Sequence, residues 1–465
     1  MSKFCPAYPK PVERRWQALW RLWRGRDSLL EQLTTTAYRM QMGRIRTPGH
    51  QMFIVNDPDE VRKVLIEQSD GFPKHRYMDD LLRPLLGRSI FTSNGDPWRS
   101  QRRMMEQAFE QTRMEFAFPR MVDAVDTLMD RLRVLPDGAV CDIETEMTHF
   151  TADVIFRTIF SEPLSADDAR RIFAAFGVFQ HESPKATMPR YRPRWWGWWN
   201  TGGHEQTAAA AAGEIRALLR RLVEPRFHAF RSGAPSVHND ILEALLQARD
   251  AATERAMDVE ELVNEIAVLF LAGHETSASA LAWTFYFLAH SPDVQAKVQA
   301  EIDTVIGSSP PALERLQKLE LTRRVFRETL RLYPPLGFLV REAAADGCLR
   351  DQPVKKGAAV VISPWLIHRH TKFWERPDEF DPDRFLSESG RASAGKAFLP
   401  FSIGPRVCVG AGFALQEAAL VISSMVREFR FSPVPGAQPQ PVARLSLRSD
   451  IGVRVHLGRR SPAPP

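Results

Sequence analysis

Cysteine is scarce in this chain of 465 residues: there are four, and no two of them form a CxxC pair. They are scattered over the whole chain, which argues against a disulfide framework, so we expect a reducing compartment, the cytoplasm. Long apolar runs are also lacking. No stretch approaches the roughly 20 apolar residues of a membrane span, and the first residues lack the apolar core of a secretory signal. The net charge of +6 is too small to indicate nucleic-acid binding; it favours an acidic partner or anionic lipid.

Helical periodicity is abundant. From about 96 to 300 the spacing of apolar residues is typical of helices, whereas VKKGAAVVIS (354–363) predicts two strands around a glycine turn. We therefore expect a mainly α fold with a small β part. One large domain (36–458) would follow a Trp- and Arg-rich segment (1–35) and precede a disordered tail (459–465).

One long helix is predicted over DVEELVNEIAVLFLAGHETSASALAWTFYFLAH (258–290). Its middle is apolar all round, so it must cross the core. There, AGHETS brings together a glycine, an acid and hydroxyl residues, which are costly in a core unless satisfied or useful. A kink with a satisfied acid would explain these residues, and so would a functional site.

An ion-pair motif lies further along. Glu328 and Arg331 are three residues apart on one helix face, and Arg384 follows in a turn with aromatic flanks. The pair alone could be an ordinary surface contact. One carboxylate between two guanidinium groups would instead be a rigid buried staple.

The stretch FSIGPRVCVG (401–410) surrounds Cys408 with glycines and an arginine. The residues alone allow a packed thiol, a nucleophile or a metal ligand. Glycines let backbone N–H groups approach a sulfur closely. The helix predicted to begin at Gly410 would further stabilise a negative sulfur by its dipole.

In combination and order, these motifs resemble those of the cytochrome P-450 family, in particular its soluble bacterial-like members. The resemblance covers about residues 40–455. It rests on Phe401, Gly404, Arg406, Cys408 and Gly410 for the haem-binding loop, Ala272, Gly273, His274, Glu275 and Thr276 for the oxygen-activation motif, Glu328, Arg331 and Arg384 for the Glu-Arg-Arg triad, and Trp98 and Arg102 for a motif that precedes the haem.

The resemblance implies a single-domain haem-thiolate monooxygenase that inserts one atom of O2 into a lipophilic substrate. Cys408 would be the proximal ligand of haem b, because a thiolate favours O–O cleavage. A separate ferredoxin or flavoprotein would supply electrons, drawn indirectly from NAD(P)H. An inert, buried thiol describes Cys141 and Cys348 better.

Roles within the site follow from the same resemblance. Thr276 would donate a hydrogen bond where oxygen is activated, and Glu275 would relay protons with a pKa raised by burial. His274 would face another helix. The expected haem-propionate ligands are Trp98, Arg102, Arg341 and Arg406, whereas Arg103 would face outward.

The substrate pocket is expected to be mostly apolar. Phe173 and Phe176, three residues apart, either face the substrate or form an ordinary core stripe. The full set of expected lining residues is Phe173, Phe176, Phe270, Leu336, Phe338, Leu339 and Leu445.

Tryptophans beside arginines occur twice, in YRPRWWGWWN (191–200) and around Trp16, Trp20 and Trp23. Such pairs suit a membrane interface. Peripheral contact with lipid through the N-terminus and the lid loop is one interpretation, and packing of these rings on the protein itself is the other.

Two other functions are compatible with a haem-thiolate domain. One is a peroxide-driven or redox-neutral enzyme, which often lacks the acid–alcohol pair that Glu275 and Thr276 supply here. The other is a non-enzymatic haem sensor, which would usually carry an output domain.

Overall fold

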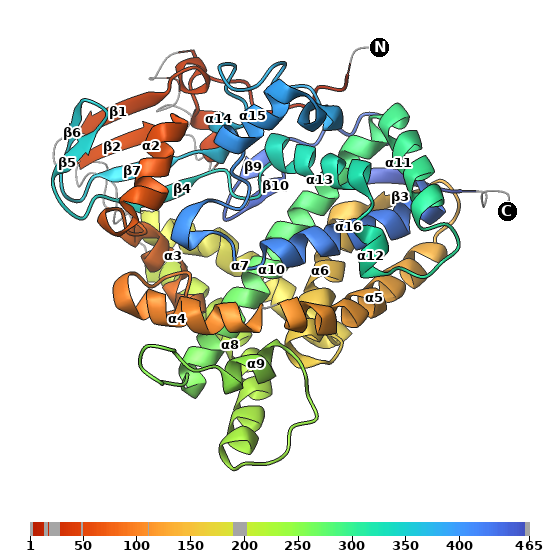
Figure 1. Cartoon of the computed structure of the whole chain (residues 1–465), viewed down its shortest axis with the longest axis horizontal. Helices are drawn as coiled ribbons and strands as arrows, with labels where there is room; N and C mark the ends of the chain where they lie inside the picture. Colours follow the sequence, from red (N-terminus) through yellow and green to blue (C-terminus); the bar gives the residue numbers. More distant parts are fainter. Residues whose placement is uncertain are drawn as a thin grey trace.

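The structure, a computed structural model, describes residues 3–13, 17, 28–47, 50–109, 111–188 and 202–460. Helices make up most of it. The sheet of β1, β2, β7 and β4 lies on one side of the molecule, with β5 and β6 beside it (Figure 1). The expected mainly α fold with a small β part is confirmed.

The α-helices in chain order are α2 (Pro58–Arg62), α3 (Arg76–Leu86), α4 (Gly95–Ala108), α5 (Gln111–Arg133), α6 (Ile143–Phe160), α7 (Ala166–Thr187), α8 (Gly202–Arg231), α9 (Ile241–Gln247), α10 (Val259–Ala289), α11 (Pro292–Val305), α12 (Leu313–Leu316), α13 (Glu320–Leu332), α14 (Pro364–Ile367), α15 (Glu388–Ala397) and α16 (Ala411–Glu428). Short 3₁₀ or π turns are η1 (Leu29–Gln32), η2 (Thr35–Tyr38), η3 (Lys63–Glu67), η4 (Ser69–Gly71), η7 (Pro382–Leu386) and η8 (Gly404–Arg406).

The largest sheet has the order β1-β2-β7-β4, in which only the β2–β7 pair is parallel. Smaller sheets pair β3 and β8 with β11, β9 with β10, and β5 with β6. The strands are β1 (Met42–Thr47), β2 (His50–Val55), β3 (Ala139–Asp142), β4 (Leu339–Glu342), β5 (Gly347–Leu349), β6 (Gln352–Val354), β7 (Ala359–Ile362), β8 (Phe429–Pro433), β9 (Pro441–Ala443), β10 (Leu447–Ser449) and β11 (Arg454–Arg459).

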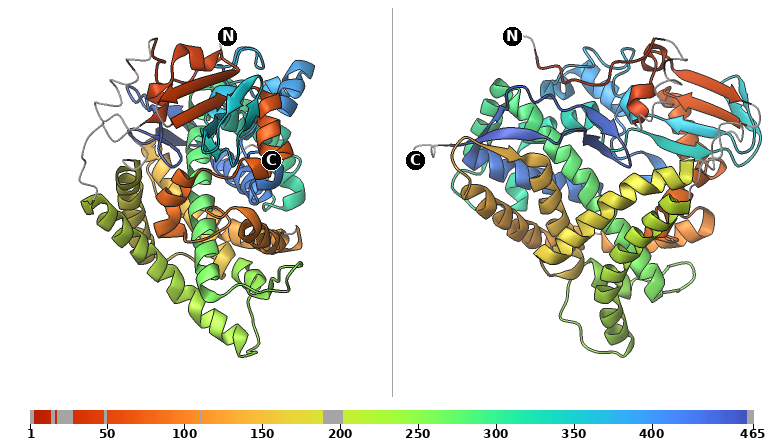
Figure 2. Two further views of the ribbon diagram at one scale, coloured as in Figure 1. Left: turned by 90° about the vertical axis from the view of Figure 1, so that its left-hand side faces the viewer. Right: turned by 180° about the vertical axis from the view of Figure 1, so that it is seen from behind.

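Helix α10 runs through the middle of the molecule (Figure 2). It begins with a capping box, in which Asp258 and Glu261 each accept a hydrogen bond from the other's backbone N–H. The backbone stays helical through the AGHETS stretch, without a break. Within the described residues α10 is the one helix long and apolar enough to cross a membrane, but 78% of that window is buried inside the protein, as in the core helix of a soluble fold.

Helix layers lie on both sides of α10. Helix α16 lies on the face nearest the viewer in Figure 1, and α7 and α8 form a layer on the opposite face, seen from behind in Figure 2. Residues 3–13 lie against the domain: Phe4 stacks on His290 with ring centroids 4.7 Å apart, and the Tyr333 hydroxyl donates to the carbonyl of Ala7.

Candidate active site

The segment around Cys408 is a tight loop that only certain residues can form. Gly404 has φ of +78°, and a Cβ atom there would lie 2.2 Å from the carbonyl oxygen of Leu65. The backbone N–H of Cys408 donates to the carbonyl of Phe401 at 3.0 Å, which closes the loop. Glycine at 404 is therefore required twice, by conformation and by space.

Cys408 lies just before the N-terminus of α16, and its side chain reaches a large cavity. Burial raises the pKa of the Cys408 thiol, while a hydrogen bond from the Gly410 N–H and the nearby Arg102 guanidinium act in the opposite direction. These two groups and the helix dipole stabilise a thiolate only in part. A metal cation on the sulfur would supply the rest.

The other cysteines have different surroundings. Cys141 is buried, and burial raises the pKa of its thiol to about 12, so it is inert. Cys348 is exposed, and the expectation that it is buried is wrong. It lies in the short strand β5, where its side chain faces the solvent.

The cavity beside Cys408 has a volume of about 2370 Å³. Pockets for a single small ligand usually measure about 300–1,000 Å³, so there is room for a prosthetic group and a substrate together. Cys408 and Phe401 lie on one wall, and Ala272, Gly273 and Thr276 of α10 lie on another.

A cluster of cations lines the cavity near the Cys408 loop: Lys74, Arg341 and Arg406. A β-bridge joins the backbones of Lys74 and Arg341. Burial lowers the pKa of Arg341 to about 10, and burial together with the charge of Arg341 lowers that of Arg406 to about 9. No carboxylate among the described residues forms an ion pair with any of the three cations. Lys74 and Arg406 donate to neutral acceptors, the carbonyls of Phe91 and Ser93. The three charges thus lack an anion, and two carboxylates of a bound group would compensate them.

Two of the expected propionate ligands have other contacts. Arg102 lines the cavity, but it donates to the carbonyl of Val407 at 2.7 Å and pairs with Glu106. Trp98 does not line the cavity; the Arg406 guanidinium lies 4.1 Å from the centre of its ring. Trp98 thus positions Arg406. Lys74 was missed, because in the sequence it looks like an ordinary surface lysine.

The AGHETS residues of α10 face two ways. Thr276 faces the cavity, and its hydroxyl donates to the carbonyl of Ala272 at 2.7 Å. Glu275 and His274 point away from the cavity. His274 packs among Phe173, Phe176 and Phe270, which agrees with a helix-packing role.

The expected raised pKa of Glu275 is wrong. Although burial alone would raise it, an ion pair with Arg448 and a hydrogen bond from Ser446 at 2.6 Å lower the pKa to about 2. Gln180 of α7 donates a further hydrogen bond at 2.8 Å. Glu275 is therefore a stably ionised anchor, and nothing in its surroundings prepares it to release or accept protons near neutral pH.

A different acid keeps its proton. Burial raises the pKa of Glu417 on α16 to about 8, against a hydrogen bond with Ser277 that lowers it. Ser277 follows Thr276 and lines the cavity. Glu417 was missed in the sequence. The sequence feature that could have revealed it is an acid on the buried face of a helix, between Phe413 and Leu420.

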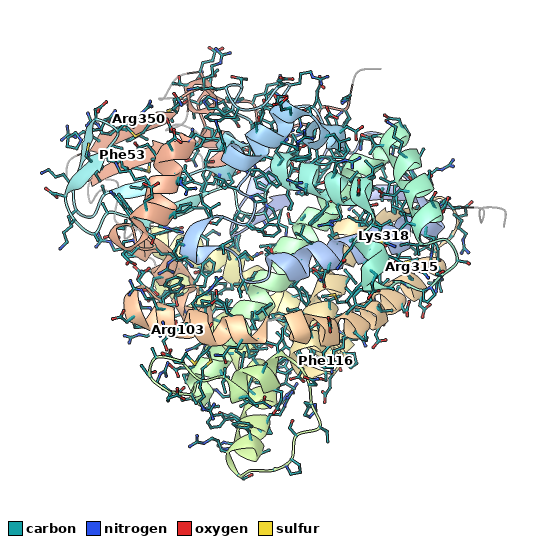
Figure 3. All side chains as sticks on the ribbon, viewed as in Figure 1. Phe53, Arg103, Phe116, Arg315, Lys318 and Arg350 are labelled. Carbon is teal, nitrogen blue, oxygen red and sulfur yellow. The ribbon has the colours of Figure 1, made fainter. Side chains whose placement is uncertain are left out.

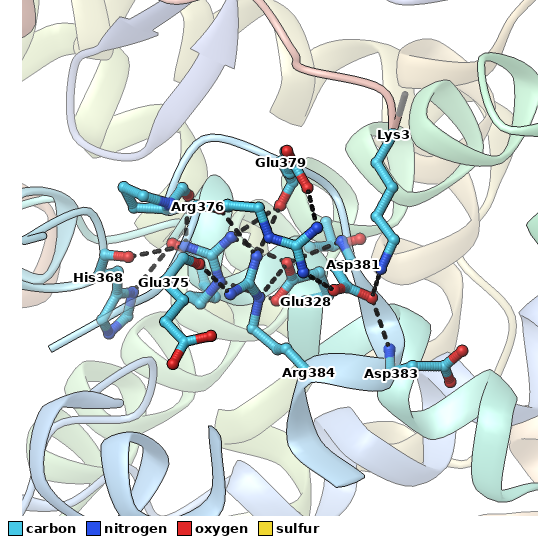
Figure 4. Close-up of polar contacts among 12 residues, drawn as sticks. Lys3, Glu328, His368, Glu375, Arg376, Glu379, Asp381, Asp383 and Arg384 are labelled. Atoms are coloured by element: carbon cyan, nitrogen blue, oxygen red, sulfur yellow. Dashed lines mark hydrogen bonds and ion pairs between the residues drawn. The ribbon is translucent and has the colours of Figure 1, made fainter. Parts of the chain in front are cut away.

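The Glu-Arg-Arg staple is formed as expected (Figure 4). Arg331 donates two hydrogen bonds to Glu328, at 2.8 and 2.9 Å, and Arg384 donates one at 2.8 Å. All three side chains are buried, and the remaining guanidinium N–H groups reach backbone carbonyls of residues 368 and 375–379. The carboxylate also accepts the N–H of Asp381, so the cluster is fully satisfied and rigid.

The expected pocket residues divide into two groups. Leu336, Phe338, Leu339 and Leu445 line the cavity, as predicted. Phe173, Phe176 and Phe270 do not; they belong to the hydrophobic core, so the core stripe is the correct interpretation. Helix α7 turns another face to the cavity, made of Gly177, Gln180, His181 and Pro184.

Taken together, a cysteine loop at a helix N-terminus, a cavity beneath a core helix and a rim of unpaired cations define a haem-thiolate protein. The family model described as "Cytochrome P450" matches residues 6–453, and the chain belongs to this family. The residues fit the group it implies: Cys408 would bind the iron of haem, and Lys74, Arg341 and Arg406 would bind its propionates.

Similar proteins agree. The chain is 30% identical to pentalenene oxygenase of Streptomyces avermitilis, over 90% of each chain. It is 31% identical to cyclooctat-9-en-7-ol 5-monooxygenase of Streptomyces melanosporofaciens, over 84% of this chain and 83% of that one. The heme domain of cytochrome P450DA shares the fold, with a TM-score of 0.79 at 24% identity, over 91% and 90% of the two chains. The protein is thus a haem-dependent monooxygenase that uses O2. Haem would supply the oxidising chemistry, and Thr276 turns its side chain to the cavity that would hold it.

Proposed function

We propose that this monooxygenase oxidises a lipophilic substrate of terpenoid size, with electrons from a separate donor. The apolar wall of the cavity supports this most directly: it is formed by Ile90, Phe91, Leu269, Phe338, Leu339 and Leu445. An apolar wall binds hydrocarbon skeletons by burial of area and gives little orientation by itself.

The names of two relatives favour the same class of substrate. The name of pentalenene oxygenase describes an alkene as substrate, and the name of cyclooctat-9-en-7-ol 5-monooxygenase describes an alcohol as substrate. At about 30% identity these names support a substrate class and not a particular compound.

The test is reconstitution of the purified protein with a ferredoxin, a ferredoxin reductase and NADPH. A panel of cyclic terpenes is screened for spin-state shifts, and products are identified by mass spectrometry. Reductase-dependent hydroxylation supports the proposal. Product formed with hydrogen peroxide alone, and none with the reductase system, would favour the peroxide-driven alternative.

The electron donor is proposed to dock on the face that carries α16. Figure 3 looks onto this face, where Arg315 and Lys318 are labelled. Lys318 is exposed, and no carboxylate among the described residues pairs with either cation. An acidic ferredoxin or flavoprotein would meet them. Arg103 lies on the same surface but is neutralised by Asp250, at 2.7 Å.

Charge reversal tests the docking face. Lys318→Glu should slow electron transfer several-fold at low salt and much less at high salt. Arg170→Glu on α7, on the opposite face, is the control and should leave the rate unchanged. Equal effects of the two substitutions would contradict this docking face.

Peripheral contact with lipid is a further part of the proposal. Its tryptophans, at 16, 20 and 23 and within 191–200, lie outside the described residues. Flotation of the protein with anionic liposomes would support it, and absence of flotation would end it.

A further inference from the structure

The cavity wall contains two polar side chains whose hydrogen-bond donors both point to the same buried carboxylate. Gln180 of α7 and Ser446 both line the cavity. Both donate a hydrogen bond to Oε1 of Glu275, at 2.8 and 2.6 Å. Glu275 itself lies behind them, away from the cavity.

The charge of Glu275 decides how these two groups are oriented. An ionised carboxylate only accepts hydrogen bonds. The Gln180 amide must therefore turn its NH₂ group toward Glu275, which leaves its carbonyl oxygen, Oε1, at the other end of a planar group. Ser446 has a single O–H, which it donates to Glu275, so only its oxygen lone pairs remain to accept a hydrogen bond from a ligand.

Arg448 keeps this arrangement fixed. Its guanidinium pairs with Glu275 and also donates to Thr148 at 3.1 Å, so the carboxylate stays ionised and immobile. Within the described part of the chain, no donor forms a hydrogen bond with Oε1 of Gln180. Gln180 and Ser446 therefore present acceptors to the cavity. The neighbouring lining residues His181 and Lys185 bond to each other and to Glu182.

We propose that Gln180 and Ser446 form an acceptor anchor for a hydroxyl or N–H group of the substrate. The preferred substrate is then a lipophilic alcohol, or a comparable N–H compound, and not a plain hydrocarbon or an ether. The anchor fixes one end of the skeleton and so determines which carbon approaches the oxidising centre. This inference rests on the proposed function and specifies its substrate class.

Three probes of nearly equal shape separate these classes: cedrol, cedryl methyl ether and cedrane. Their binding to the haem-loaded protein is measured by equilibrium dialysis, which needs no turnover, and by the spin-state shift. One neutral hydrogen bond corresponds to about a twofold to tenfold change in affinity. We expect cedrol to bind tighter than the other two by about this factor.

Variants assign the effect. Gln180→Met keeps the length of the side chain and removes the acceptor, so the preference for cedrol should fall to near one. Leu445→Met, in the same wall, is the matched control and should change all three dissociation constants by a similar factor. Thermal unfolding of each variant checks that the fold is retained.

Two results would overturn the anchor: equal binding of the three probes to the wild type, or a preference for cedrol that persists in Gln180→Met. The latter would place the hydroxyl elsewhere, for example on the iron. A Gln180-dependent preference without any oxidation of cedrol or other terpenes would instead contradict the proposed function and leave the anchor supported.

Discussion

The backbone N–H of Leu399 donates a hydrogen bond of 2.8 Å to Nε2 of His368. On its other side, the Nδ1–H of His368 donates to the carbonyl of Arg331 at 3.1 Å. These two bonds require neutral imidazole in one tautomer, and burial with the nearby Arg331 charge lowers the pKa of His368 to about 3. The ring thus joins the Glu-Arg-Arg staple to the chain that leads into the Cys408 loop.

This connection predicts that the staple controls haem retention without touching haem. Glu328→Ala leaves two buried guanidinium groups without their carboxylate, which should cost about 3–5 kcal/mol. We expect little haem-loaded protein, measured as the ratio of haem to protein absorbance. Glu320→Ala, on the exposed start of the same helix, is the control. Normal haem content in Glu328→Ala would contradict this role.

The Cys408 loop should tolerate no side chain at 404. Gly404→Ala places a Cβ against the Leu65 carbonyl and forces a residue with a side chain to positive φ, so we expect loss of haem binding and of stability by more than about 1 kcal/mol. At Gly412, in the first turn of α16, a Cβ meets nothing within 4 Å. Gly412→Ala should therefore bind haem normally. Equal haem content in the two variants would contradict the account of the loop.

The Thr276 hydroxyl should matter for coupling and not for haem binding. Thr276→Ala removes a hydroxyl that faces the cavity from α10, so we expect normal haem content with more of the NADPH consumed appearing as hydrogen peroxide. Thr284→Ala is a matched control, because Thr284 makes the same bond to a backbone carbonyl, at 2.8 Å, away from the cavity. Unchanged coupling in Thr276→Ala would disprove the assigned role.

The contributions of two buried acids to stability should depend on pH in opposite directions. Glu417 has its pKa raised from 4.5 to about 8, so its contribution to stability is complete below about pH 4.5 and is lost as the pH rises through 8. Glu417→Gln should therefore gain stability relative to the wild type between about pH 5 and pH 8, as measured by urea unfolding. A pH-independent difference would contradict the raised pKa.

The pKa of Glu275 is shifted in the opposite direction to that of Glu417. Its pKa is lowered from 4.5 to about 2, so its contribution is present above about pH 4.5 and is lost as the pH falls through 2. At neutral pH, Glu275→Gln removes the shorter of the two ion pairs of the buried Arg448, which keeps only Glu144 at 3.4 Å. This should destabilise the protein by about 3 kcal/mol. A neutral or stabilising effect at pH 7 would show that the pair is not what keeps Glu275 ionised.

Contacts local in the sequence were predictable, and distant ones were not. The Cys408 loop and the bond from Thr276 to Ala272 depend on neighbouring residues, so their chemistry is visible in the motifs. Glu275 was misjudged because its partner Arg448 is 173 positions away. Without that partner, burial alone predicts a raised pKa, which is the opposite of what the structure shows.

Which face of a helix meets the cavity could not be predicted from the sequence. On α7, the Phe173 and Phe176 stripe and the Gln180 face are both compatible with helical spacing, and only packing against α10 decides which one meets the cavity. Likewise, a β-bridge between distant segments brings Lys74 beside Arg341, and spacing in the sequence does not show it.

The central claim is that Cys408 binds haem iron as a thiolate. The most direct test is the difference spectrum of the dithionite-reduced protein with and without carbon monoxide, compared with that of Cys408→Ser. A strongly red-shifted Soret band in the wild type, lost in Cys408→Ser, is the predicted result. A band typical of histidine ligation in the wild type, or no haem in well-folded protein, would contradict it.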